Sequence, residues 1–173
     1  MNQASEDRLN AVHPQLASRV RQLATMLAAE DIFIAVAQGL RTIAEQDALF
    51  AKGRDASGEI VNKGQIVTNA RGGQSWHNFG LAVDCYPLEV NAVGIDWNPQ
   101  HPAWKQMEQL GVSLGMTSGA NWIRLVDAPH FQLTGRFPEG APTEEVNELY
   151  KSGGLQAVWD AVTASLPKQE EPA

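Results

Sequence analysis

Apolar residues recur along the chain at two different spacings, which together predict a mixture of helices and short strands. Residues 14–29 carry leucine and valine at intervals of three and four, as in a helix with one buried face, and Pro14 suits its first turn. A second helix of this kind is predicted to begin at Pro102 and to end at Gly111 or Gly115. Both helices are expected to pack on the core.

Short runs rich in β-branched and aromatic residues predict the strands. These runs lie at residues 32–37, 66–69, 79–88, 122–126 and 131–133. Gly80 places a bend at the start of the third run, and Pro129 breaks the chain between the last two. Helices and strands in this mixed order favour an α+β fold with a small, mainly antiparallel sheet flanked by helices.

The residues that follow the first strand predict a capped helix. Thr42 and Glu45 have the spacing of a capping box, and Gly53 is placed to end the helix. Arg41 therefore lies at a junction between a strand and a helix. Residues 53–65 are polar and interrupted by glycine, which predicts an exposed loop that borders a cleft.

The C-terminal part predicts two further helices, at residues 143–150 and 155–166, separated by a pair of glycines. The polar segment 167–173 after them is expected to be a disordered tail. No internal repeat and no change in composition marks a second module. Residues 1–166 are therefore expected to form a single domain.

The charge of the chain argues against several kinds of partner. It has 13 basic and 20 acidic residues among 173, a net charge of -7, and no cluster of basic residues. Such a chain is not expected to bind nucleic acid or to dock on anionic lipid through charge. No stretch reaches the roughly 18 apolar residues of a membrane span, so a membrane partner is not expected either.

The first residues and the cysteine content bear on where the protein acts. Residues 1–10 contain acidic side chains and lack the apolar core of a secretory signal, so the chain is expected to be made in the cytoplasm without a signal peptide. Cys85 is the only cysteine, which rules out an intramolecular disulfide. Action outside the cytoplasm would require a separate release route.

Two segments carry side chains with the chemistry of a catalytic metal site. His77 and Asp84 lie in one segment, and Asp127 and His130 lie in the other. Catalytic zinc commonly takes three nitrogen or oxygen ligands and keeps one position open for water. The two pairs converge only if the chain bends at the glycine and the proline noted above. On residue types alone, structural histidines and an ion-paired aspartate remain the simpler interpretation.

The order of residues in these segments resembles that of a family of zinc peptidases, the D-alanyl-D-alanine carboxypeptidases and L-alanyl-D-glutamate endopeptidases. The first motif consists of Ser75, His77, Gly80, Ala82 and Asp84. The second motif lies downstream and consists of Asp127, Pro129, His130 and Phe131. The resemblance also reaches residues 12–16, 39–46 and 154–159, and it is sharpest over residues 39–132.

The resemblance implies a metallopeptidase fold of the LAS and hedgehog-like type, a single peptidase catalytic domain, and a role for each matched residue. His77, Asp84 and His130 are expected to hold one zinc ion. Asp127 is expected to accept and deliver protons as the catalytic carboxylate. Arg41 is expected to stabilise the oxyanion that forms during attack on the peptide.

Other matched residues leave more than one interpretation open. Ser75 and Gln46 fall where such peptidases contact substrate, although a turn-forming serine and a solvated helix residue remain alternatives. His13 is interpreted as a helix cap or a surface residue. Cys85 is interpreted as a core residue, because it follows Asp84 directly and points to the opposite face of a regular strand.

One departure within the family favours the endopeptidases. Carboxypeptidase members often have Glu, followed by a Trp-His pair, where this chain has Asp127 and the sequence Pro129, His130, Phe131. The resemblance therefore implies that a monomer cuts the L-alanyl-D-glutamate bond of the peptidoglycan stem peptide after release to the cell wall, for example through a holin. Removal of terminal D-alanine, and a non-catalytic zinc-structured wall-binding domain, are the alternatives.

Overall fold

A computed structural model describes residues 1–89, 94–123 and 126–167 of the chain. Four strands form one antiparallel sheet in the order β1-β2-β4-β3. The strands are β1 (Ile34–Gln38), β2 (Ala82–Pro87), β3 (Thr117–Ser118) and β4 (His130–Gln132). The α+β class and the small antiparallel sheet predicted from the sequence are confirmed.

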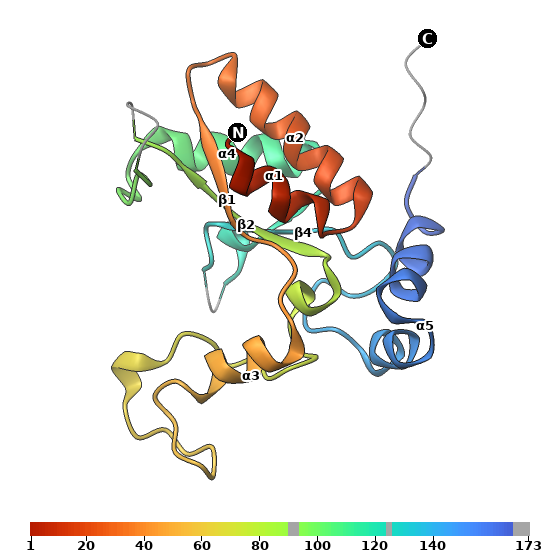
Figure 1. The fold of residues 1–173 in the computed structure, drawn as a ribbon. Coiled ribbons are helices and arrows are strands. Elements are labelled where there is room, and N and C mark those ends of the chain that lie inside the picture. The colour runs from red at the N-terminus through yellow and green to blue at the C-terminus, as the bar shows by residue number, and fades with distance from the viewer. Residues whose placement is uncertain (90–93, 124–125, 168–173) are drawn as a thin grey trace.

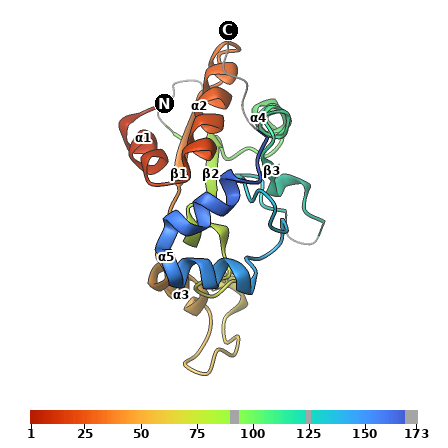
Figure 2. The ribbon, with the colours of Figure 1, turned by 90° about the vertical axis from the view of Figure 1, so that its right-hand side faces the viewer.

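Three helices cover one face of this sheet: α1 (Gln3–Asn10), α2 (Pro14–Ala28) and α4 (Pro102–Ser113). Figure 1 shows them gathered on one side of the strands, and Figure 2 shows α1 and α4 on either side of α2. Alternate residues of the strands point into the core that these helices form. The strand residues in that core are Ile34, Val36, Val83, Cys85 and Phe131.

The opposite face of the sheet carries the polar side chains. Asp84 of β2 lies directly across from His130 of β4, and both alternate with buried apolar neighbours. Helix α3 (Ile43–Ala51) lies away from the first three helices (Figure 1), whereas α5 (Glu144–Thr163) meets the N-terminus of α2, where His13 contacts Trp159 and Thr163. A second apolar cluster, which includes Phe79, Val146 and Val158, packs α5 against the segment before β2.

The segment before β2 contains the bend that the sequence predicted at Gly80. The short 3-10 helix η2 (Trp76–Phe79) ends at Gly80, whose backbone is left-handed with φ of +63°. Its N–H bonds back to the carbonyl oxygens of His77 and Trp76, and β2 begins two residues later. The left-handed turn therefore brings His77 and Asp84 to the same place, which a straight strand would not do.

Replacing Gly80 by alanine is expected to destabilise the protein by about 1–3 kcal/mol, because a Cβ disfavours a left-handed backbone. The new Cβ would also lie 3.1 Å from the Trp159 ring. Thermal unfolding measures the effect, as a fall in Tm of roughly 2–10 °C. Gly140→Ala is the matched control, since nothing lies within 4 Å of its Cβ position. Equal Tm values for both variants would contradict the expectation.

Most predicted helices are confirmed, with some adjustment at their ends. Helix α3 has the capping box of Thr42 and Glu45. Helix α4 ends before Gly115, which has φ of +77°, whereas Gly111 lies inside it and packs closely against the Phe131 ring. The two predicted C-terminal helices form α5, which has non-helical backbone at the predicted pair of glycines.

One predicted strand is wrong, and a second lies partly outside the described residues, at positions 124 and 125. Residues 66–69 form no strand; Arg54 donates to the Thr68 carbonyl and the Asn69 side chain, so this segment is held by side chains rather than by a neighbouring strand. In the region predicted as a strand at residues 122–126, the described residues are irregular. The edge strand lies earlier in the chain, at β3, followed by the 3-10 helix η3 (Gly119–Asn121).

Helix α1 was not predicted from the sequence. It is short and mostly polar, and it buries only Ser5 and Leu9. The Ser5 hydroxyl accepts the Val36 N–H of β1, so a tertiary contact ties the helix to the sheet. In the loop predicted at residues 53–65, the 3-10 helix η1 (Lys63–Gln65) and a bridge between Arg54 and Ile60 give local order.

Two further features complete the description. The predicted C-terminal tail lies outside the described residues from position 168 onward. Among the described residues, none of the helices has the length and apolar character that crossing a membrane requires.

Candidate metal centre and substrate cleft

Three side chains of the metal-binding type converge where β2 and β4 pair. The Asp84 Oδ1 atom lies 3.3 Å from His77 Nε2 and 3.4 Å from His130 Nδ1. The three ligand atoms, one from each residue, all lie within 4.8 Å of one another. Ligands at the corners of a tetrahedron around zinc lie about 3.3 Å apart when the bonds are about 2.0 Å long. The donor set and its spacing therefore fit a zinc ion.

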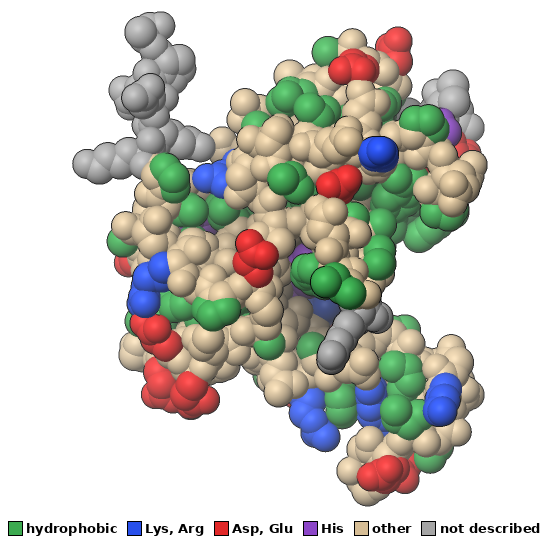
Figure 3. Space-filling model, turned by 180° about the vertical axis from the view of Figure 1, so that it is seen from behind, with side chains coloured by type: hydrophobic (Ala, Val, Ile, Leu, Met, Phe, Trp, Pro, Cys, Tyr) green, Lys and Arg blue, Asp and Glu red, His purple; other side chains and the backbone are tan. Residues whose placement is uncertain are grey.

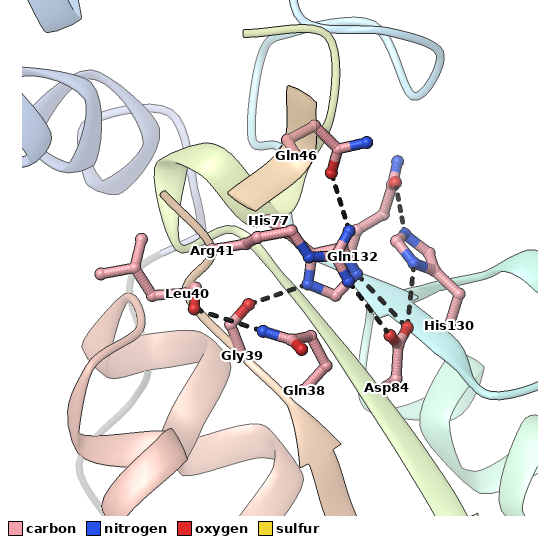
Figure 4. Close-up of polar contacts among 9 residues, drawn as sticks. All are labelled: Gln38, Gly39, Leu40, Arg41, Gln46, His77, Asp84, His130 and Gln132. Carbon is pink, nitrogen blue, oxygen red and sulfur yellow. Dashed lines mark hydrogen bonds and ion pairs between the residues drawn. The ribbon is translucent and has the colours of Figure 1, made fainter. Parts of the chain in front are cut away.

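The second nitrogen of each imidazole is held by a fixed partner (Figure 4). His77 Nδ1 lies 2.9 Å from the Gly39 carbonyl oxygen, which can only accept, so this nitrogen carries the proton. His130 Nε2 lies 3.0 Å from Gln132 Oε1. The Gln132 amide donates to the Glu139 carbonyl over 2.6 Å, which orients its oxygen toward His130. With the protons on these nitrogens, His77 Nε2 and His130 Nδ1 are the ring atoms that would coordinate a metal.

Replacing Gln132 by leucine is expected to weaken zinc affinity by about 10- to 100-fold, because His130 loses the partner that fixes its tautomer. Competition with a zinc-binding dye measures the affinity directly. Gln156→Leu is the control, since Gln156 is exposed on α5 and far from the site in sequence. An unchanged affinity in Gln132→Leu would show that Gln132 does not orient the ligand.

Burial and charge act in opposite directions on these groups. Burial alone would raise the pKa of Asp84, but its contacts with His130 and His77 lower that pKa well below its usual range. For His130, burial lowers the pKa, whereas the hydrogen bond and the negative charge of Asp84 raise it, and the net change is upward. A concentrated negative charge between two imidazoles favours a bound cation.

Arg41 lies beside the three convergent residues. Its Nη2 atom is 3.9 Å from Asp84 Oδ2, and its Nη1 atom donates to Gln46 Oε1 over 2.7 Å. Gln46 in turn donates to the Ala70 carbonyl and is completely buried. From the sequence, Gln46 was either a substrate contact or a solvated helix residue. The solvated alternative is wrong, because the side chain is buried and contacts Arg41 from the protein side.

Asp127 precedes His130 in a tight turn, in which the His130 N–H bonds to the Asp127 carbonyl over 3.1 Å. Burial and the nearby charge of Asp84 raise the pKa of Asp127, although His130, His77 and Arg41 partly offset this. A carboxylate with a raised pKa is a better proton acceptor. The Asp127 N–H bonds to the Gly119 carbonyl. A Cβ on Gly119 would lie 2.5 Å from the backbone carbonyl oxygen of Asp127, so only glycine fits at this position.

These side chains open onto a cleft of about 780 Å³, which we call the metal-site cleft. The cleft is lined by six of the seven predicted site residues: Arg41, Ser75, His77, Asp84, Asp127 and His130. Figure 3 shows a histidine surface at the base of a hollow between two parts of the molecule. Residues 67–70 border the cleft, whereas the predicted loop at residues 53–65 does not.

Sequence reasoning missed three residues that hold the site in place. They are Gln132, Gly119 and Asn78, whose amide donates to the carbonyl oxygens of Arg41 and Thr42. Gln132 and Asn78 each lie within two residues of a predicted ligand, and this proximity was the only available signal. Gly119 gave none, because its contact with Asp127 arises only in the folded chain.

His13 and Cys85 lie outside the site, as the sequence predicted. His13 caps α2 by accepting the Gln15 N–H, but it is buried and contacts Trp159 and Thr163, so the surface alternative is wrong. Cys85 is fully buried in the core, and burial raises the pKa of its thiol. A protonated, inaccessible thiol is not a nucleophile.

An open cleft that ends on two imidazoles and a carboxylate, with a second carboxylate alongside, is the arrangement of metal-dependent hydrolases. Comparison with known proteins narrows this class. The chain belongs to the VanY family of D-alanyl-D-alanine carboxypeptidases, whose family model matches residues 9–148.

Individual relatives include two L-alanyl-D-glutamate endopeptidases and a D,D-pentapeptidase. The peptidoglycan L-alanyl-D-glutamate endopeptidase CwlK of Bacillus subtilis (strain 168) is 32% identical over 129 residues, or 70% of this chain and 73% of that protein. The crystal structure of the L-Ala D-Glu endopeptidase ChiX of Serratia marcescens has a TM-score of 0.55 and 29% identity over 79% of this chain and 90% of that one. A third relative is the D,D-pentapeptidase VanY from a VanB-type vancomycin resistance cassette. Its crystal structure in complex with Zn(II) has a TM-score of 0.48 and 16% identity over 83% of this chain and 81% of that one.

Proposed function

We propose that this protein is a zinc-dependent peptidase that hydrolyses the L-alanyl-D-glutamate bond of peptidoglycan stem peptides. The observation that carries the proposal is the 3.3 Å and 3.4 Å spacing of the His77, His130 and Asp84 donor atoms at the end of an open cleft. The names of CwlK and ChiX support the choice of bond, because both relatives are described as endopeptidases of this specificity.

His77, Asp84 and His130 would hold the zinc ion through one atom each, and Asp127 and Arg41 would act on the substrate beside it. When bound, zinc would lower the pKa of a water molecule, so that the water can lose a proton and act as a nucleophile near neutral pH. The Asp127 carboxylate takes a proton from the attacking water and passes it to the leaving amine of D-glutamate. The Arg41 guanidinium, held by Gln46, stabilises the negative charge that develops on the alanine carbonyl oxygen.

Ser75 lines the cleft next to His77 and is proposed to contact the peptide. Its hydroxyl makes no capping bond to η2 and is therefore not used by the local turn. Gln46 is proposed to act through Arg41 rather than on the peptide, because its side chain is buried. The substrate places the action of the protein at the cell wall, and we propose that it acts there as a monomer after release from the cytoplasm.

Digestion of purified peptidoglycan by the zinc-loaded protein, followed by mass spectrometry of the fragments, tests the proposal. We expect glycan fragments that end in L-alanine and peptides that begin with a free D-glutamate amine. The Asp127→Asn protein, matched in zinc content, is the control for contaminating hydrolases.

Other fragment patterns would point to the alternatives. Release of D-alanine alone would assign the carboxypeptidase reaction named in the family description. Zinc bound at one ion per chain, with no new ends in walls of several chemotypes, would support a binding domain without catalysis.

A further inference from the structure

Beyond the metal-site cleft, one exposed aromatic group stands out on the described surface. The indole of Trp97 is 69% exposed, although tryptophan usually buries most of its surface. Its ring lies 5.3 Å from that of Tyr86 in an edge-to-face arrangement, and Tyr86 contacts Trp104 in the same way at 5.8 Å. We call Tyr86 and Trp97 the aromatic platform.

The turn that carries Trp97 is fixed by several hydrogen bonds. The Asp96 N–H bonds to the Pro87 carbonyl at the end of β2. The Asp96 carboxylate accepts the Asn98 N–H and lies 3.2 Å from His101. The Trp104 indole donates to the Asp96 carbonyl. These bonds fix the backbone beside Trp97, so a ligand that stacked on its exposed ring would cost little backbone entropy.

The aromatic platform continues the face of β2 that carries the metal site. Asp84 and Tyr86 are two residues apart on one strand, so their side chains share a face and their Cα atoms lie roughly 7 Å apart. The residues that line the metal-site cleft include Asp84 but neither Tyr86 nor Trp97. The platform therefore lies two residues along β2 from Asp84, outside the cleft that is proposed to receive the rest of the peptide.

We propose that the aromatic platform binds, by stacking on Trp97, the sugar of peptidoglycan to which the stem peptide is attached. This inference rests on the proposed function. An L-alanyl-D-glutamate endopeptidase finds only one amino acid between the cut bond and the lactyl group of the sugar. An extended alanine spans about 3.5 Å, and the lactyl group adds a comparable length, which matches the step from Asp84 to Tyr86. The apolar face of a pyranose ring packs on an aromatic face, and nearby Asn98 and His101 offer polar groups for its hydroxyls.

Two substrates that differ only in the sugar provide the test. One is a free stem peptide that begins with L-alanine, and the other carries the same peptide on the disaccharide GlcNAc–MurNAc. We expect kcat/KM to be about tenfold higher for the glycosylated substrate, the size of one aromatic stacking contact. In Trp97→Ala this ratio should fall to about one, and in Trp97→Phe it should be partly restored. Val112→Ala, which removes an exposed apolar side chain from α4, is the control and should keep the ratio.

A binding measurement separates this inference from the proposed function. Titration of the peptide-free disaccharide should shift the NMR signal of the Trp97 indole N–H, and Trp97→Ala should lose binding. Disaccharide binding without any peptide cleavage would support the platform and overturn the proposed function. Cleavage of both substrates at equal rates, with no disaccharide binding, would overturn the platform and leave the peptidase activity intact.

Discussion

Asp127→Asn is expected to lower kcat/KM for peptidoglycan peptides by a factor of about 100 to 10,000, the range that a positioned acid–base group contributes. Asparagine has nearly the same shape, so the turn to His130 and the bond to Gly119 should persist. The amide cannot accept a proton from water, and it cannot return one to the leaving amine. Steady-state kinetics on a defined stem peptide measures the loss.

Zinc content decides how that loss is interpreted. Asp127 is not among the three convergent ligands, so the asparagine variant should bind one zinc ion per chain, as the unmodified protein is expected to do. A variant that keeps its zinc and loses its activity places Asp127 in the proton transfer. Retention of more than about a tenth of the activity would remove Asp127 from that role.

Asp84→Ala is expected to abolish stoichiometric zinc binding and, with it, hydrolysis. Asp84 Oδ1 is the atom that both histidines face, and without it only two imidazoles remain. Zinc at about 1,000 times its Kd would stabilise the unmodified protein by about 4 kcal/mol, or roughly 10 °C in Tm. The alanine variant should show no such rise in a thermal unfolding experiment.

The matched control for this experiment is Asp7→Ala, which removes an exposed carboxylate from α1. It should keep both the zinc-dependent rise in Tm and the enzymatic activity. A full rise in Asp84→Ala would contradict the assignment of Asp84 as a ligand. An Asp84→Ala protein that loses zinc but still cleaves the stem peptide would overturn the metal-dependent mechanism.

Local sequence patterns were sufficient where a local rule controls the backbone. The capping box at Thr42 and Glu45 forms as predicted, because its hydrogen bonds join residues three positions apart. The bend at Gly80 was also predictable, since few residues other than glycine adopt a left-handed backbone. The α+β class followed from the mixed order of helical and strand patterns.

The elements that were missed depend on distant partners. Residues 66–69 have the composition of a strand, but Arg54 bonds the Thr68 carbonyl and the Asn69 side chain, and the segment pairs with no strand among the described residues. Helix α1 has too few apolar residues for a periodic signal, and Ser5 joins it to β1 across a long separation in the sequence. Composition does not reveal such partners, because the contacts form only after the chain folds.

For this protein, the sequence by itself determined which side chains are proposed to carry the chemistry, through two motifs whose residue types and order resemble those of a zinc peptidase family. Only the tertiary structure decided how those side chains meet. The antiparallel pairing of β2 with β4 sets Asp84 opposite His130, and the turn at Gly80 brings His77 to them. It also decided that Gln46 lies behind Arg41. Metal binding depends on distances of a few ångströms, and strand register and turns fix these distances.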